Sequence, residues 1–97
     1  MAIAAVLTIP GGTLQQYDDI LRQLNFAPGG PGAPGGLYHW VTATDSGIRV
    51  TDVWRSRELF EAYYRDQVGP LLAKAGLPEP EVEVFEVHNY LTSGPEA

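Results

Sequence analysis

Two polar residues in the middle of the chain have a spacing at which general-base chemistry can arise. His39 and Asp52 each lie in a segment rich in aromatic and β-branched residues, at 37–44 and 48–54, and such segments are typical of strands. The Asp-Ser-Gly sequence at 45–47 predicts a hairpin turn between them. A two-residue loop would place His39 directly opposite Asp52. A histidine held by a carboxylate is a general-base arrangement.

The pairing of His39 with Asp52 depends on the length of that loop. A three-residue loop would put the two side chains on opposite faces of the sheet and remove the base. Even when paired, the two residues also fit a purely structural hydrogen bond. His88 is the second candidate base, and it fits equally a histidine used for packing or at a dimer interface. His88 and Asn89 are consecutive in the last expected strand, so one of them should face the helices.

Aromatic residues form a second group of candidates, for the walls of a binding pocket. Phe60, Tyr63 and Tyr64 lie on the apolar stripe of the helix expected after the hairpin, within reach of a pocket between helix and sheet. Tyr64 could hold a substrate hydroxyl there. An aromatic stripe at helical spacing is also what an ordinary core uses, so both interpretations stay open.

The elements that position these residues follow a simple order. A strand is expected at 2–9, a helix capped by Thr13 up to about Asn25, the hairpin at 37–54, a helix capped by Ser56 that breaks or kinks at Gly69-Pro70 and resumes to residue 75, and a strand at 81–91. Two β-α-β units joined by a hairpin predict an α+β, ferredoxin-like β-α-β-β-α-β fold. Its four-stranded antiparallel sheet has both helices on one face.

The chain is short enough that 1–97 forms a single domain. The segment APGGPGAPGG at 27–36 contains five Gly and three Pro, which excludes a regular element. It is either a disordered surface connection or a mobile lid beside a pocket. Residues 93–97 form a polar tail.

The expected sheet has apolar residues on both faces. With a two-residue loop, Tyr38, Trp40 and Val53 share the face opposite to His39 and Asp52. An isolated monomer would expose this apolar patch to water. We therefore expect a homodimer in which two sheets pair face to face.

The composition argues against several partners and cofactors. A formal net charge of −6 and a pI near 4.6 would repel a phosphate backbone, so neither nucleic acid nor an anionic membrane surface is expected. The apolar run at 2–9 is far short of the roughly 20 residues of a membrane span, and no positive charges precede it as in a signal peptide. Cysteine is absent, and the two histidines and scattered carboxylates show no metal-ligand spacing. These features predict a cytoplasmic protein without a metal.

Several segments resemble one known superfamily. The element order over 2–91, RVTDVWRSRELFEAYYRD at 49–66 and VEVFEVHNYL at 82–91 are similar to the dimeric α/β-barrel superfamily, most closely to its antibiotic biosynthesis monooxygenase-like branch. The superfamily includes cofactor-free oxygenases of aromatic polyketides, polyketide cyclases, lactone isomerases and haem-degrading enzymes. The resemblance implies that Trp54 lies in the pocket, where it would stack on a flat phenolic substrate. A strand-end Trp packed on the second helix is the structural alternative.

The resemblance and the residues together predict a cofactor-independent monooxygenase that acts on a phenolic or polyketide-like small molecule. Such a substrate supplies its own electrons to oxygen once a base has deprotonated it, so no cofactor is needed. Haem is not expected, because haem-degrading relatives usually use a histidine of the second helix and residues 57–75 contain none. A polyketide cyclase or isomerase would use the same base without oxygen. A non-catalytic small-molecule-binding protein would use only the pocket.

Overall fold

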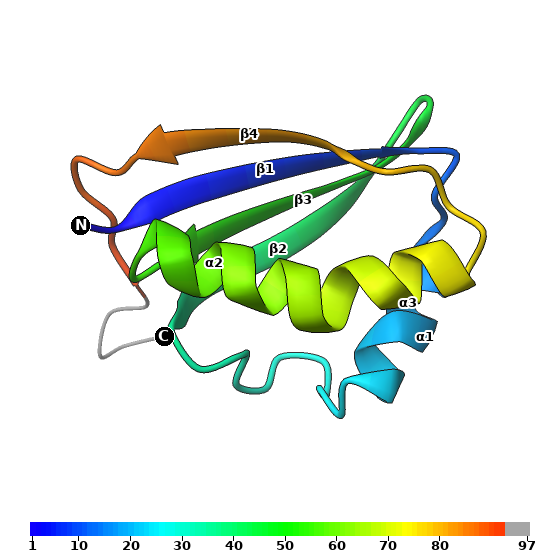
Figure 1. The fold of residues 1–97 in the computed structure, drawn as a ribbon, viewed down its shortest axis with the longest axis horizontal. Helices are drawn as coiled ribbons and strands as arrows, with labels where there is room; N and C mark the ends of the chain where they lie inside the picture. The colour runs from blue at the N-terminus through cyan, green and yellow to red at the C-terminus, as the bar shows by residue number, and fades with distance from the viewer. Residues whose placement is uncertain (93–97) are drawn as a thin grey trace.

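The computed structural model describes residues 1–92, and the expected order of elements is confirmed within them (Figure 1). The elements are β1 (Ile3–Pro10), α1 (Leu14–Gln23), β2 (Gly36–Thr44), β3 (Gly47–Trp54), α2 (Arg57–Tyr63), η1 (Tyr64–Val68), α3 (Gly69–Lys74) and β4 (Glu81–Glu86). The polar tail expected at 93–97 lies outside the described residues. None of the helices within residues 1–92 has the length and apolar character needed to cross a bilayer.

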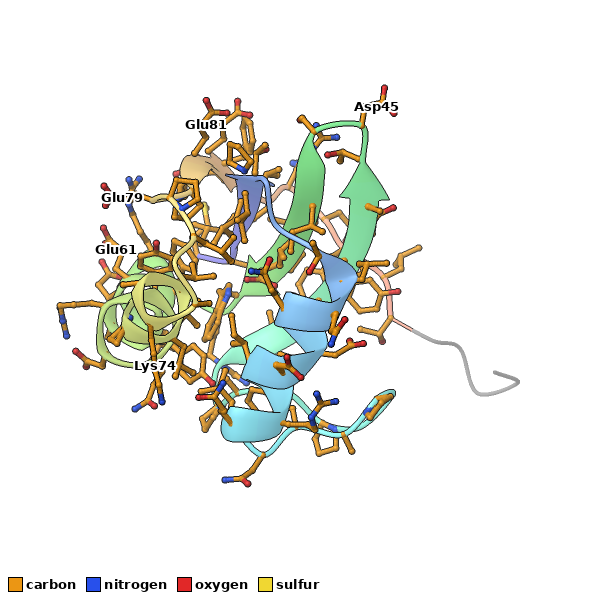
Figure 2. All side chains as sticks on the ribbon, turned by 90° about the vertical axis from the view of Figure 1, so that its right-hand side faces the viewer. Asp45, Glu61, Lys74, Glu79 and Glu81 are labelled. Carbon is orange, nitrogen blue, oxygen red and sulfur yellow. The ribbon has the colours of Figure 1, made fainter. Side chains whose placement is uncertain are left out.

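The four strands form one antiparallel sheet in the order β2-β3-β1-β4. The helical segments α1 and α2–α3 lie on the same side of this sheet (Figure 1), and Figure 2 shows the long α2–α3 helix nearly end-on with α1 beside it. This arrangement is the predicted ferredoxin-like α+β fold. It leaves a layer between helices and sheet in which a site can form.

Helix α1 is bounded at both ends by local sequence signals. The Thr13 hydroxyl accepts a bond from the Gln16 backbone N–H, and the Gln16 side chain accepts one from the Thr13 backbone N–H. At the other end Asn25 adopts a left-handed conformation with φ of 66°, and the Phe26 N–H bonds to the Leu21 carbonyl. These caps confirm the predicted helix and confine it to less than three turns, which end directly at the Gly/Pro loop.

The sequence predicted that the second helix breaks or kinks at Gly69-Pro70, and the structure shows that it does not break there. It continues through η1, a π-helical turn in which the Gly69 N–H bonds to the Tyr64 carbonyl five residues earlier. Proline has no N–H and its ring crowds the preceding turn, and the wider π turn lets the chain pass Pro70 and remain helical. The helix then ends at Lys74, and Gly76, with a φ of +77°, turns the chain away two residues later.

The core lies between the helices and the inner face of the sheet. Alternate residues of β1 are buried, and two apolar clusters pack on them. The first cluster centres on Trp54 and Phe60, and the second on Ile20 and Leu72. Leu14 and Leu59, near the N-terminal ends of α1 and α2, remain exposed and lie outside this core.

The last strand is shorter than expected. Its alternating sequence runs to Leu91, but β4 ends at Glu86, which pairs with Ile3 at the start of β1. One further bond follows, from the Val87 N–H to the Ala2 carbonyl. Strand β1 begins at Ile3, so β1 provides no partner for residues 88–91, and their alternating sequence forms no strand.

Candidate functional site

A cavity of about 800 Å³ lies in the layer between the sheet and the helices. Its polar wall comes from the hairpin and α1, its aromatic wall from the second helix, and its remaining boundary from the Gly/Pro loop. The residues that matter for chemistry are Tyr17, His39, Asp52, Trp54, Phe60, Tyr63 and Tyr64. Most of the residues that sequence analysis singled out therefore line one cavity.

His39 and Asp52 are direct partners across the β2–β3 hairpin. The turn has two residues, since Thr44 pairs with Gly47, and the same register pairs His39 with Asp52. The Nδ1 atom of His39 is hydrogen-bonded to Oδ1 of Asp52. The geometric condition set by the sequence, a two-residue turn, is met.

Asp52 is a buried carboxylate with a second partner. The residue is 8% exposed, and its Oδ2 accepts a hydrogen bond from Nε1 of Trp54 at 3.2 Å. An indole N–H can only donate and an ionised carboxylate can only accept. Trp54 therefore fixes the orientation in which Oδ1 of Asp52 meets His39.

Tyr17 of α1 completes this arrangement, and sequence analysis did not assign it to the site. Its hydroxyl is hydrogen-bonded to Nε2 of His39, and the two rings are nearly parallel, with an interplanar angle of 15°. In the sequence, Tyr17 only shares a helical spacing with Leu14, Leu21 and Leu24, as one position of an apolar stripe. A tyrosine in such a stripe carries a hydroxyl that needs a partner when buried, and that was the available signal.

The environment of Tyr17 keeps its hydroxyl protonated. Burial, with smaller contributions from the negative charges of Asp52 and Asp18, raises the pKa of Tyr17 from 10.0 to about 12. The Asp52 carboxylate can only accept, so in the neutral imidazole Nδ1 carries the hydrogen and Nε2 is the acceptor. The Tyr17 hydroxyl therefore donates to Nε2 of His39. The result is a chain of hydrogen bonds from Tyr17 through His39 and Asp52 to Trp54.

Aromatic rings of the second helix face this chain of polar groups. The ring of Trp54 lies 5.5 Å from that of Tyr63 and 6.1 Å from that of Phe60, centroid to centroid, and Phe60 lies 6.2 Å from Tyr64. The pairs are tilted, which is a favourable geometry for aromatic contacts. Burial raises the pKa of both Tyr63 and Tyr64, so both hydroxyls are neutral. This wall suits a flat apolar molecule.

The Gly/Pro loop borders the cavity, as its lid interpretation requires. Residues 26–33 line it, and the end of the loop is held by a bond from the Arg55 N–H to the Gly35 carbonyl at 2.8 Å. Gly35 has a φ of +87°, and a Cβ there would come within 2.8 Å of the Leu59 side chain. The loop is therefore fixed at its β2 end, and whether the rest moves stays a prediction.

His88 and Asn89 do not reach the cavity. Both are exposed and follow the end of β4, and neither lines the cavity. The expectation that one of them faces the helices depended on a strand to Leu91, which the structure does not contain. Within residues 1–92 no group of three or more His, Asp or Glu side chains is placed to hold a metal ion.

Solved structures similar to this chain share one architecture. A protein from Chloroflexus aurantiacus J-10-fl assigned as an antibiotic biosynthesis monooxygenase is 20% identical, with a TM-score of 0.64 over 97% of this chain and 100% of its own. SnoaB, a cofactor-independent oxygenase from Streptomyces nogalater, is 18% identical, with a TM-score of 0.55 over 95% and 96%. A monooxygenase from the gene ActVA-Orf6 of Streptomyces coelicolor, in complex with the ligand nanaomycin D, is 16% identical, with a TM-score of 0.54 over 96% and 92%.

The chain has the fold of the antibiotic biosynthesis monooxygenase-like proteins. The match extends over nearly the whole chain in each case, which confirms the predicted fold. No protein-family model matches the sequence, and the comparison with curated proteins gives no match either. Identities of this size establish the fold alone, and the fold hosts more than one chemistry. The activity has to be argued from the cavity.

Proposed function

We propose that this protein is a cofactor-independent monooxygenase that acts on a phenolic or polyketide-like small molecule held between the sheet and the helices. The observation that carries the proposal is the His39–Asp52 pair, which lies in a cavity with an aromatic wall on its other side. His39 would accept a proton from the substrate, and Asp52 would orient the imidazole and stabilise its charged form. The structural neighbours include a cofactor-independent oxygenase, which supports the proposed activity.

The chemistry needs only a base, oxygen and a substrate that can donate electrons. Removal of a proton from an acidic C–H of a polycyclic phenol leaves a carbanion. That carbanion gives its electrons to O₂ and forms a C–O bond to it, and the resulting peroxide is protonated. Loss of water then leaves a carbonyl, so one CH₂ group and one O₂ become one C=O group and one H₂O. The aromatic wall of Trp54, Phe60, Tyr63 and Tyr64 would hold the rings flat and exclude water.

The outer face of the sheet supports a homodimer as part of the proposal. Tyr38, Trp40 and Phe85 are 57%, 47% and 51% exposed on that face. In the register of the sheet, Tyr38 lies beside Val53, then Ala4, then Phe85, so the four strands carry one apolar row. A patch of this kind is a typical site of association. Two copies that pair through this apolar row would bury it and leave both cavities facing outward. We propose that the protein is cytoplasmic.

Oxygen uptake tests the proposed activity. Anthrone is a suitable probe, because it is a flat tricyclic compound with an acidic CH₂ group. With no added metal, flavin or nicotinamide, we expect the protein to accelerate oxygen uptake above the buffer rate, with one O₂ consumed per anthrone oxidised. Proton exchange without oxygen uptake would indicate a cyclase or isomerase instead. Saturable binding with neither exchange nor uptake would indicate a binding protein.

A further inference from the structure

Both nitrogen atoms of the His39 ring already have partners. Nδ1 is bonded to Asp52 and Nε2 to the hydroxyl of Tyr17. A proton acceptor needs a free lone pair directed at the substrate. In this arrangement His39 offers none, because its accepting nitrogen is covered by Tyr17.

The chain of hydrogen bonds from Trp54 through Asp52 and His39 ends at the Tyr17 oxygen. This oxygen is the atom of the chain that remains available to a substrate. Its hydrogen is used toward His39, so its lone pairs are left as acceptors, and Tyr17 itself lines the cavity. We propose that Tyr17 is the residue that contacts the substrate, and that the proton reaches His39 through its hydroxyl. The inference rests on the proposed function and adds a residue to it: His39 and Asp52 act through Tyr17.

The proton transfer balances in one concerted step. The substrate C–H or O–H proton moves to Oη of Tyr17 while the original Oη proton moves to Nε2 of His39. The substrate becomes an anion, Tyr17 remains neutral, and His39 becomes an imidazolium paired with the Asp52 carboxylate. The raised pKa of Tyr17 agrees with this order of events, since it disfavours a free tyrosinate and therefore a stepwise transfer.

The same geometry predicts which ligands bind well. A hydroxyl whose hydrogen is already used can accept a hydrogen bond but cannot donate one to the ligand. A flat molecule with a phenolic O–H should therefore bind better than its methyl ether of nearly equal shape. One hydrogen bond of this kind corresponds to a preference of about fivefold.

Deuterium exchange in the absence of oxygen measures the proton transfer separately from oxidation. The rate at which solvent deuterium enters the anthrone CH₂ group is followed by NMR. We expect Tyr17→Phe and His39→Ala each to lower the protein-dependent exchange rate about 10²-fold or more. The double variant should be no slower than the slower single variant, because the two groups act in series. Tyr90→Phe makes the same chemical change outside the cavity and should leave the rate unchanged.

Two results of this experiment would overturn the inference. If Tyr17→Phe exchanges as fast as the wild type or faster, Tyr17 only covers Nε2 and His39 contacts the substrate itself. If the losses of the two single variants add in the double variant, the groups act independently.

A binding measurement covers the case in which the wild type accelerates neither exchange nor oxygen uptake, so that the proposed function fails. Dissociation constants of 2-naphthol and 2-methoxynaphthalene are measured by fluorescence for the wild type and for Tyr17→Phe. The inferred contact predicts about a fivefold preference for 2-naphthol in the wild type and none in Tyr17→Phe. Equal affinities in the wild type, or no binding of 2-naphthol to it, contradict the contact without any variant having to fold.

Discussion

At the level of single residues, the donor and acceptor groups of the site determine the direction of each hydrogen bond in it. Trp54 can only donate and the Asp52 carboxylate can only accept, so Asp52 accepts from both Trp54 and His39. The remaining His39 nitrogen then accepts from Tyr17. A buried carboxylate without such partners would be strongly destabilising. The same contacts that stabilise the fold therefore orient the proposed base.

The raised pKa of Tyr17 predicts how stability depends on pH. The native state holds this proton more tightly than the unfolded chain, in which tyrosine titrates near 10.0, while the native value is about 12. Stability from this group is complete below about pH 10 and is lost as the pH rises through about 12. The free energy of unfolding in urea should therefore fall less steeply between about pH 10 and pH 12 in Tyr17→Phe than in the wild type.

Tyr90→Phe is the matched control for that titration, because Tyr90 is exposed and outside the cavity. Its stability should fall with pH as steeply as that of the wild type. Identical slopes for Tyr17→Phe and Tyr90→Phe would show that Tyr17 is not buried beside Asp52 as described.

The residues of the site differ in how far sequence could predict them. The His39–Asp52 pair follows from counting along a two-residue turn, because strand register is set locally. Tyr17 joins the pair from a helix 22 residues earlier. That contact depends on the rotation and position of α1 on the sheet, and no local rule fixes either. His88 was a candidate because the sequence predicted a strand to Leu91, and β4 ends at Glu86 before reaching it.

At the scale of elements, the hairpin register depends on a close approach between two chain segments. The Gly11 N–H bonds to the Ser46 carbonyl at 2.8 Å, so the end of β1 holds the tip of the β2–β3 hairpin. A Cβ on Gly47 would lie 2.2 Å from the Ile9 carbonyl oxygen, which is backbone and has little freedom to move. Gly47 therefore allows β3 to start directly against β1.

Gly47→Ala should consequently destabilise the protein by at least about 2 kcal/mol, since the hairpin has to shift away from β1. The free energy of unfolding in urea measures this. Gly32→Ala is the matched control, because a Cβ at Gly32 meets no atom within 4 Å, and its effect should stay within about 0.5 kcal/mol. Equal effects of the two substitutions would contradict the close approach at Gly47.

The Gly/Pro loop at 27–36 gives a second prediction for an element. The loop is mostly exposed, and it borders the cavity between fixed points at Phe26 and Gly35. The amide hydrogens of Gly29, Gly32 and Ala33 should exchange rapidly in the free protein and about tenfold more slowly when 2-naphthol is bound. Asp45 lies at the tip of the β2–β3 hairpin (Figure 2) and does not line the cavity, so its exchange should not change. Slow exchange of the loop in the free protein, or no change on binding, would contradict the lid.

The elements themselves were largely predictable, and the two differences have physical causes. Helix caps at Thr13 and Ser56 and the turn at 45–47 are local signals, and each is confirmed. The end of β4 is not local, because it is set by the length of its partner β1. The π turn before Pro70 is also not a local signal, because it accommodates the proline ring while the rest of the helix stays packed on the sheet.

For the molecule as a whole, the two faces of the sheet have different tasks. The inner face carries the core and the cavity, and the outer face carries the exposed row that includes Tyr38, Trp40 and Phe85. Within residues 1–92 both helical segments lie on the inner side (Figure 1). The proposed homodimer covers the outer face with a second copy of itself.

Sedimentation at micromolar concentration tests this dimer. The wild type should have about twice the 10.5 kDa mass of the chain. Trp40→Glu should shift the protein toward monomer, because it places a charge in an apolar contact. Gln67→Glu adds the same charge at an exposed position on η1 and should remain dimeric. A monomeric wild type would contradict the proposed association.

In the proposed reaction the His39–Asp52 pair in the cavity deprotonates a phenolic substrate that then reacts with oxygen. The most direct measurement compares oxygen uptake with anthrone by the wild type and by His39→Ala, without added cofactors. We expect oxygen uptake well above the buffer rate for the wild type and a rate about 10²–10⁴-fold lower for His39→Ala, with the secondary structure unchanged in circular dichroism. A folded His39→Ala variant that consumes oxygen as fast as the wild type, or a wild type no faster than buffer, would contradict it.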